Sequence, residues 1–164
     1  MLKIIIAIVI ICSTTSCWYS FKDVSIAPNI KTYKVNYIEN KARYINPQLT
    51  AKITDKLRQK IISQTKLSPS NDNPNIEITG TVTDYSITTS GVNTATGAST
   101  NRLNIGLTIE IKNNVEPDKT VQSVVSRNFD FPSSQSFSEF ENSRLDEVIR
   151  NVVDEIFNKI FSNW

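Results

Sequence analysis

The clearest pattern in the sequence is the alternation of apolar with small or polar residues between Arg102 and Lys112. Successive side chains of a β-strand point to opposite faces of the sheet, so this alternation predicts a strand with one buried and one exposed face. Such a strand needs a second layer over its apolar face, and it leaves its other face to water or to a polar partner. The residues predicted to face inward are Leu103, Ile105, Leu107, Ile109 and Ile111.

Three further segments show a one-sided apolar pattern and are predicted as strands. In the second of them the pattern changes phase after Val82, because Tyr85 and Ile87 carry it at odd-numbered positions. One extra residue near Thr83 and Asp84 accounts for the change, so a β-bulge is predicted there. The predicted strands are residues 32–38, with Tyr33, Val35 and Tyr37 facing inward, residues 76–87, and residues 120–131, with Val121, Val125, Phe129 and Phe131 in phase.

Two segments predict amphipathic helices that can cover the apolar face of this sheet. The first begins at Asn46 and Pro47, since Asn is a good N-cap and Pro is tolerated at the first helical position, and it ends near Lys66. The second begins at Ser136, which with Glu139 has the spacing of a capping box. The apolar stripes are Leu49, Ile53, Leu57 and Ile61, widened by Ile62, in the first helix, and Leu145, Val148, Ile149, Val152, Ile156, Phe157, Ile160 and Phe161 in the second.

The charged residues of both predicted helices lie away from the apolar stripes. In the second helix, Asp146 with Arg150 and Glu155 with Lys159 have the i,i+4 spacing of ion pairs within one helix. The first helix has a basic outer face, which is either an ordinary solvated surface or a surface that attracts an anionic partner. The residues of this basic face are Lys52, Lys56, Arg58 and Lys60.

The predicted order of elements is β-α-β-β-β-α. It corresponds to an α+β fold, a two-layer sandwich in which a four-stranded sheet carries two helices on one face. Residues 88–100 contain no charge and almost no bulky side chain, so they are predicted as a long loop between the second and third strands. The sheet face opposite the helices is predicted to be polar, rich in Thr, Asn and Glu, and covered by water or by a polar partner.

The first sixteen residues have the features of a secretory signal peptide. Lys3 gives a basic start, and the apolar run Ile4–Ile11 is too short to span a bilayer. The small residues before Cys17 resemble a lipobox, the lipidation signal of bacterial lipoproteins, which implies acyl groups such as palmitate on Cys17. The alternative is an ordinary signal peptide with a free cysteine beside the cleavage site. We therefore expect a signal peptide at residues 1–16, a lipidated lead-in at residues 17–31 and a single α+β domain at residues 32–164.

The composition argues against several classes of function. The formal charge of +2 is small, whereas nucleic-acid binding needs a concentrated basic surface. The chain has no histidine and no cysteine after Cys17, which removes the commonest general base and any thiolate zinc site. We find neither a glycine-rich phosphate loop nor a nucleophile beside a base. We therefore expect no enzyme activity, no metal and no cofactor other than the covalent lipid on Cys17.

Six short segments, taken in order, resemble the LptE family of lipopolysaccharide-assembly lipoproteins in the form found in Bacteroidota. The resemblance covers nearly all of the chain after the signal peptide, and it rests on the shared order of the segments. The segments are Cys17–Phe21 (CWYSF), Ile26–Pro28 (IAP), Asn46–Leu49 (NPQL), Gly80–Tyr85 (GTVTDY), Asn101–Leu103 (NRL) and Phe157–Trp164 (FNKIFSNW), the last being the most specific.

This resemblance implies an outer-membrane lipoprotein whose domain faces the periplasm or fills the lumen of the β-barrel LptD. Members of the family help that barrel to fold and bind lipopolysaccharide on its way to the outer leaflet. Because lipopolysaccharide is anionic, exposed cations near the predicted loop are candidate contacts, with Arg102 best placed and Lys112 and Arg127 behind it. Arg127 falls on the apolar phase of its strand, so it needs either a buried partner or a position beyond the cover of the helices.

A function of a different class stays open at this point. The chain could be a periplasm-facing lipoprotein adaptor of another cell-envelope complex, such as an activator of cell-wall synthesis or the anchor of a secretion complex. Both interpretations share the lipid anchor and the fold class, so only the partner separates them. An enzyme is the weakest interpretation, because the sequence contains no catalytic constellation.

Overall fold

The structure, a computed structural model, describes residues 26–92 and 99–161. The predicted signal peptide, Cys17 and the first part of the lead-in lie outside the described residues. The elements in chain order are β1 (Thr32–Val35), β2 (Glu39–Asn40), α2 (Pro47–Gln64), β3 (Ser68–Pro69), β4 (Ile76–Val92), β5 (Ser99–Asn113), the 3-10 helix η1 (Pro117–Lys119), β6 (Val121–Pro132) and α3 (Phe137–Phe161).

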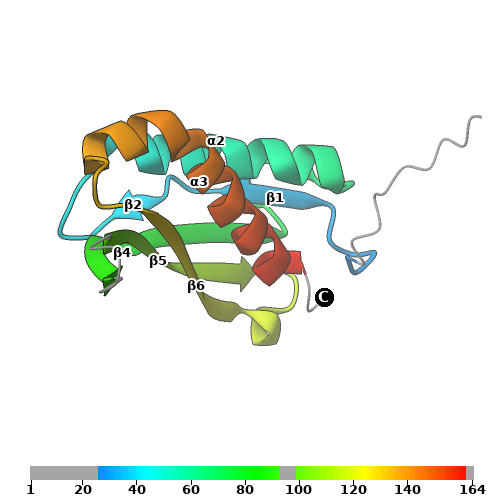
Figure 1. Cartoon of the computed structure of the whole chain (residues 1–164). Coiled ribbons are helices and arrows are strands. Elements are labelled where there is room, and N and C mark those ends of the chain that lie inside the picture. Colours follow the sequence, from blue (N-terminus) through cyan, green and yellow to red (C-terminus); the bar gives the residue numbers. More distant parts are fainter. Residues whose placement is uncertain (1–25, 93–98, 162–164) are drawn as a thin grey trace, which may run out of the picture.

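The strands form one six-stranded sheet, and α2 and α3 lie over the same face of it (Figure 1). The strand order is β3-β1-β4-β5-β6, and β2 also pairs with β4. β1 runs parallel to β3 and β4 because α2 carries the chain back across the sheet, whereas β4, β5 and β6 are an antiparallel meander. The predicted two-layer α+β sandwich is confirmed. The two additional strands, β2 and β3, have two residues each, which is too short for an alternation to be recognised.

The predicted apolar stripes form the core between the helices and the sheet. Ile62 does not belong to it: its side chain is 52% exposed, because it lies 100° around α2 from Ile61 and away from the sheet. The prediction that Ile62 widens the stripe is therefore wrong. The buried residues of the two stripes and of β5 are Leu49, Ile53, Leu57, Ile61, Leu145, Val148, Ile149, Val152, Ile156, Phe157, Ile160, Phe161, Leu103, Ile105, Leu107, Ile109 and Ile111.

Three strand residues predicted to face the core are exposed. Ile87 pairs with the buried Leu103 and so lies on the covered face of β4, but its side chain is 43% exposed. β1 ends at Val35, so the alternation stops before Tyr37, which is 57% exposed and whose hydroxyl lies 2.8 Å from the Thr50 hydroxyl. Val121 is 48% exposed, because it begins β6 at the edge of the sheet. The predicted phase is therefore correct for Val121, which pairs with the buried Ile111, although its side chain is not covered, and it does not extend to Tyr37.

The predicted β-bulge is confirmed. The register between β4 and β5 shifts between Val82, which pairs with Leu107, and Asp84, which pairs with Gly106. Thr83 is the extra residue, and the shift turns Tyr85 toward the core, where it is buried.

The predicted long loop at residues 88–100 is largely strand. β4 continues to Val92 and β5 begins at Ser99, with Thr88 opposite Arg102 and Thr89 opposite Asn101. Threonine favours extended backbone, but this part of the hairpin buries no regular apolar face, so the sequence shows no alternation there. Residues 93–98, at the centre of the predicted loop, lie outside the described part of the chain.

Both predicted helix starts are confirmed at the level of hydrogen bonds. The Asn46 side chain accepts a hydrogen bond from the Gln48 backbone N–H at 2.8 Å, with Pro47 at the first helical position of α2. At the start of α3, the Ser136 N–H donates to the Glu139 carboxylate at 3.0 Å, and the Glu139 N–H donates to the Ser136 hydroxyl at 3.3 Å. These reciprocal bonds satisfy N–H groups that a helix start otherwise leaves without a partner.

The two ion pairs predicted within α3 are replaced by pairs between elements. Asp146 pairs with Lys52 of α2 at 3.0 Å, and Glu155 pairs with Arg127 of β6 at 2.7 Å. A tertiary partner competes with the i,i+4 partner because an exposed pair within one helix contributes only about 0.2–0.5 kcal/mol. These contacts tie α3 to its neighbours on both sides.

A close approach at Gly80 generates a test of the core. A Cβ atom at this position would lie 2.9 Å from Cγ1 of Ile38 and 3.1 Å from Cδ1 of Ile109, and both side chains are buried. We expect Gly80→Ala to lower the free energy of unfolding by about 1–3 kcal/mol through overpacking. Gly91→Ala is the control, since a Cβ there meets nothing within 4 Å. Urea denaturation of both variants checks this, and equal effects at the two positions would contradict it.

Candidate functional site

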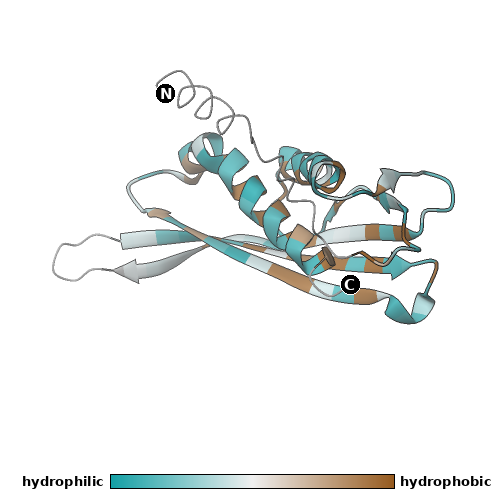
Figure 2. Cartoon of the chain, turned by 90° about the vertical axis from the view of Figure 1, so that its right-hand side faces the viewer, coloured by the Kyte–Doolittle hydropathy of each residue, from teal (hydrophilic) through white to brown (hydrophobic). Residues whose placement is uncertain are grey.

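The sheet face away from the helices is open and polar, and no described element covers it (Figure 2). Val124, which is 68% exposed, is a bulky aliphatic residue on this face. Hydroxyl and amide groups can form hydrogen bonds with water or with a polar partner. Burying them against a partner costs less than burying an unpaired charged side chain. The open face is formed by Glu77, Thr79, Thr81, Ser86 and Thr88 of β4, Arg102, Asn104, Thr108, Glu110 and Lys112 of β5, and Gln122, Val124, Ser126, Asn128 and Asp130 of β6.

The three predicted ligand contacts do not lie together. Arg102 and Lys112 occupy opposite ends of the open face on β5, about 34 Å apart at ~3.4 Å per strand residue. Arg127 pairs in the sheet with the buried Ile105, so it lies on the face that the helices cover. The structure therefore separates the three residues into different surroundings, and their part in ligand binding stays a prediction.

Arg102 is held by a partner on the neighbouring strand. Its Nε lies 2.6 Å from Oδ1 of Asp130, and its Nη2 lies 2.9 Å from Oδ2, so the ion pair is bidentate. Hydrogen bonding to the guanidinium lowers the pKa of Asp130 below its ordinary value of 3.8. An anionic ligand at Arg102 must therefore share this guanidinium with Asp130 or displace it.

Lys112 lies at the far end of the open face, opposite Glu77. It lines a shallow polar pocket of about 450 Å³ together with Asn73, Asn75 and Asn114. Glu77 also lines this pocket, which therefore combines one ammonium group and one carboxylate with neutral amides. Groups of these kinds can form hydrogen bonds with the hydroxyl groups of a sugar. Of the three predicted contacts, Lys112 alone makes no ion pair within residues 26–92 and 99–161.

Both alternatives raised for Arg127 hold in part. Its Nη2 lies 2.7 Å from Oε2 of Glu155, so it has the partner that an arginine on the apolar phase requires. Its side chain is nevertheless 45% exposed, so the helices do not cover it fully. Its position joins β6 to α3 and gives it a structural role whether or not it contacts a ligand.

A polar contact at the margin of the core joins the bulge to the starts of both helices. The Tyr85 hydroxyl donates to Oε1 of Glu141 at 2.5 Å, and the side-chain amide of Asn46 donates to the same oxygen at 2.6 Å. Tyr44 stacks on Tyr85 with a centroid separation of 5.7 Å, and Phe137 packs against both rings. Burial, followed by the hydrogen bond to Glu141, raises the pKa of Tyr85 well above its ordinary value of 10.0. The sequence placed Tyr85 on the inward phase but did not identify its partner 56 residues away.

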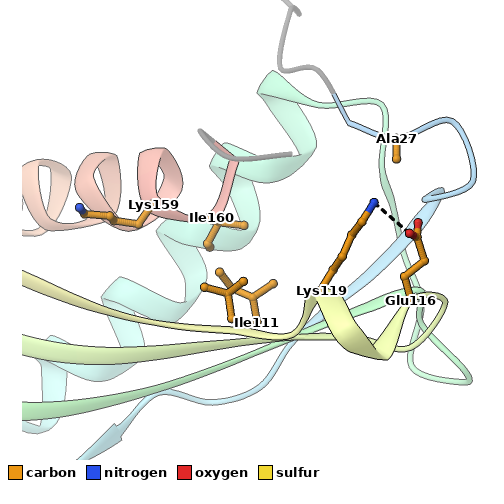
Figure 3. Close-up of a pocket in the computed structure, with 7 residues that line it drawn as sticks. Ala27, Ile111, Glu116, Lys119, Lys159 and Ile160 are labelled. Carbon is orange, nitrogen blue, oxygen red and sulfur yellow. Dashed lines mark ion pairs between the residues drawn. The ribbon is translucent and has the colours of Figure 1, made fainter.

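An apolar pocket of about 280 Å³ lies where the lead-in meets the domain (Figure 3). Its lining is formed mainly by Ala27, Ile111, Val121 and Ile160, with Glu116, Lys119 and Lys159 also in it. Glu116 pairs with Lys119 at 2.9 Å and accepts a hydrogen bond from the Asn29 amide at 3.0 Å, so the end of the lead-in is fastened to the β5–β6 connection. This pocket could not be predicted from the sequence, because its walls come from three distant segments.

The described residues contain neither a metal-ligand cluster nor a helix that could cross a membrane. Within residues 26–92 and 99–161, no group of three or more cysteine, aspartate or glutamate side chains is placed to hold a metal ion. In the same part of the chain, neither helix is sufficiently apolar over its length to cross a bilayer. The described residues form a broad polar face, scattered cations and the apolar pocket at the lead-in.

The match to a family model decides the family. The model described as LptE, lipopolysaccharide-assembly, matches residues 30–160 of this chain, from just before β1 to nearly the end of α3. The chain belongs to the LptE family. The resemblance inferred from the short segments is therefore confirmed, and it places the chain among lipopolysaccharide-assembly proteins. A comparison with curated protein sequences gives no match.

Solved structures with a similar fold are distant from this LptE-family chain in sequence. A hypothetical protein, CT253, from Chlamydia trachomatis has 6% identity and a TM-score of 0.50, with 82% of this chain and 99% of that chain covered. A minor lipoprotein from Acinetobacter baumannii has 16% identity and a TM-score of 0.46, covering 80% and 88% of the two chains. Rare lipoprotein B from Shewanella oneidensis has 12% identity and a TM-score of 0.46, covering 79% and 94%. At such identities the likeness concerns the fold alone.

The raised pKa of Tyr85 generates a test by alkaline unfolding. A group whose pKa is higher in the folded than in the unfolded chain stabilises the fold fully below the unfolded pKa, and this contribution is lost as the pH rises. We expect the free energy of unfolding to fall above about pH 10, and we expect Tyr85→Phe to make that fall shallower. Tyr85→Phe should also cost about 1.5–3 kcal/mol near neutral pH, because Glu141 loses a hydrogen bond.

Urea denaturation at a series of pH values from about 8 to about 11 measures both effects, because this range brackets the ordinary tyrosine pKa of 10.0. Tyr37→Phe is the matched control, since it also removes a hydrogen-bonded hydroxyl, the one beside Thr50, but from a side chain that is 57% exposed. Parallel pH profiles for the wild type and Tyr85→Phe would show that the Tyr85 hydroxyl does not titrate with unfolding.

Proposed function

We propose that this chain is an outer-membrane lipoprotein, anchored through acyl groups on Cys17, that plugs and assists assembly of the LptD barrel. In that position it takes part in lipopolysaccharide transport to the outer leaflet. Membership of the LptE family supports a role in lipopolysaccharide assembly. Insertion into a barrel does not follow from family membership alone, and the support for it is the polar surface of the sheet.

The observation that carries the proposal is the open polar face of the sheet. The interior of a large outer-membrane barrel is polar, so a domain inside it needs hydroxyl, amide and paired charged groups rather than an apolar surface. β4, β5 and β6 present such groups over most of the open face, with Val124 as the aliphatic exception. The apolar faces of α2 and α3 are already used by the core, so a partner of the described domain meets polar surface, and the open sheet face is a broad surface of that kind.

The lead-in supports an anchored arrangement. Ala27 and Ile26 pack against the core, and Ile30 is buried, so the chain is fastened to the domain well before β1 begins. Cys17 lies nine residues before Ile26 in the sequence. A lipid on Cys17 would therefore hold this end of the domain close to the membrane surface, within about 30 Å for an extended segment of that length.

Co-purification of a barrel tests the proposal. Full-length tagged protein from detergent-solubilised membranes should carry one large β-barrel at about equal stoichiometry, identified by mass spectrometry. Thr108→Arg places a long cation at the centre of the open face, opposite Thr81, and should reduce the recovered barrel at least several-fold. Asn158→Arg, on an exposed position of α3, is the control and should leave recovery unchanged.

Recovery of cell-wall enzymes in place of a barrel would favour the adaptor of another envelope complex. Equal recovery with Thr108→Arg and Asn158→Arg would show that the open face is not the docking surface, whatever the partner.

The pairing of Arg102 with Asp130 sharpens the test of ligand contact. If Arg102 contacts the phosphates of lipopolysaccharide, Arg102→Ala should weaken binding by about tenfold, and Asp130→Asn should strengthen it by releasing the guanidinium. Titration of lipopolysaccharide into the detergent-solubilised full-length protein measures both. Binding that both variants leave unchanged would remove Arg102 from the site and leave Lys112 and Arg127 as candidates.

A further inference from the structure

The outer surface of the helix pair carries a regular row of charged contacts. α2 and α3 run in the same direction over the sheet (Figure 1). Lys52 pairs with Asp146 at 3.0 Å, and Lys60 pairs with Asp154 at 2.6 Å. In both pairs the partners are 94 positions apart in the sequence, so the two helices keep one register over two turns.

The same register brings two cations together in the middle of the row. Lys56 is one turn from both Lys52 and Lys60, and its counterpart 94 positions on is Arg150. Lys56 and Arg150 line the same groove between the helices. Both also lie close enough to Asp146 to lower the pKa of that carboxyl, after the larger effect of Lys52. The middle position of the row is therefore a pair of like charges.

Neither of these two cations is neutralised by an ion pair within residues 26–92 and 99–161. The cations on either side of them are already paired. Lys60, for example, is bound to Asp154 and lies 5.2 Å from the centre of the Phe157 ring, and its side chain is only 19% exposed. The row thus contains the cations Lys52, Lys56, Lys60 and Arg150 against the carboxylates Asp146 and Asp154. Two positive charges are left over, and both are at the groove.

The groove has the other features of an anion site. It is an open groove of about 320 Å³, and Val153, which is buried, forms part of its lining. Asp154 also lines it, with its carboxylate paired to Lys60. Gln59 and Ser63 add neutral polar groups beside Lys56. An amide and a hydroxyl can donate hydrogen bonds to oxygen atoms that the two cations attract.

We propose that this groove binds a phosphate monoester group between Lys56 and Arg150. A phosphate monoester carries close to two negative charges at neutral pH, which matches the two cations left over in the row. The guanidinium of Arg150 can bind two phosphate oxygens in parallel, and the ammonium of Lys56 supplies a compact second charge. A peptide carboxylate carries a single charge and would leave one of the cations uncompensated. The site faces away from the sheet, so it is independent of the barrel contact and of Arg102.

The phosphate could be free in solution or carried by a lipid headgroup, and the two sources can be separated experimentally. Full-length protein in neutral detergent is titrated with sodium phosphate, and separately with phosphatidic acid in mixed micelles, against sodium chloride and phosphatidylcholine at equal ionic strength. Binding to the folded state raises the Tm with ligand concentration. We expect a rise of about 3–6 °C at ten times the Kd in at least one of the two titrations.

Substitutions test whether the ligand-dependent rise in Tm comes from binding in the groove. Lys56→Gln with Arg150→Gln should abolish the ligand-dependent rise, whereas Lys66→Gln, which removes an exposed charge just beyond α2, should retain it. Lys56→Glu converts the like-charge position into a pair of opposite charges. It should therefore raise the Tm without ligand and remove the response to phosphate.

A response to phosphatidic acid alone assigns a lipid headgroup, and a response to both ligands assigns the phosphate group itself. The proposal is overturned if neither ligand raises the Tm of the wild type more than the salt and neutral-lipid controls do. It is equally overturned if the double variant responds as strongly as the wild type.

Discussion

Burial of one face of the sheet beneath two helices is the constraint on which the rest of this structure depends. The inward residues of β4 and β5 meet the stripes of α2 and α3 in a single core, and each fully buried aliphatic side chain contributes about 1.5–3 kcal/mol. Because both helices are used on the same face, the other face of the sheet has no cover from the described chain. The open polar surface is thus a direct consequence of how the core is built.

The same arrangement determines which charged side chains are available to a ligand. Cations on the open face are few and far apart, and Arg102 is already compensated by the carboxylate opposite it on β6. Cations on the helices are more numerous. Lys52 and Lys60 pair across the two helices, whereas Arg58 and Arg144 pair within their own helix. Ligand recognition in such a protein therefore depends less on net charge than on which cations lack a partner.

The sequence predicted those parts of the fold that repeat within one element. Alternation identified β4, β5 and β6, the phase change located the bulge at Thr83, and local hydrogen-bonding residues identified both helix starts. It failed where an element ends or where no face is buried: Tyr37 lies beyond β1, and Thr88 and Thr89 continue β4 without an apolar signal. The partner of Tyr85 was not identifiable because it lies on a different element, which only the tertiary fold brings near.

Ion pairs show the same limit most clearly, and they also show what the fold adds. From the sequence, Asp146 and Arg150 are neighbours on one helix, and that spacing accounts for both charges. In the fold, Asp146 pairs with Lys52 of the other helix, so Arg150 does not form the expected ion pair and instead lines a groove together with Lys56. The charges of Asp146 and Arg150 balance along α3 alone, but they no longer balance once the cations of α2 lie beside them. The surplus charge at that groove is therefore a property of the packing, and no one-dimensional pattern could have predicted it.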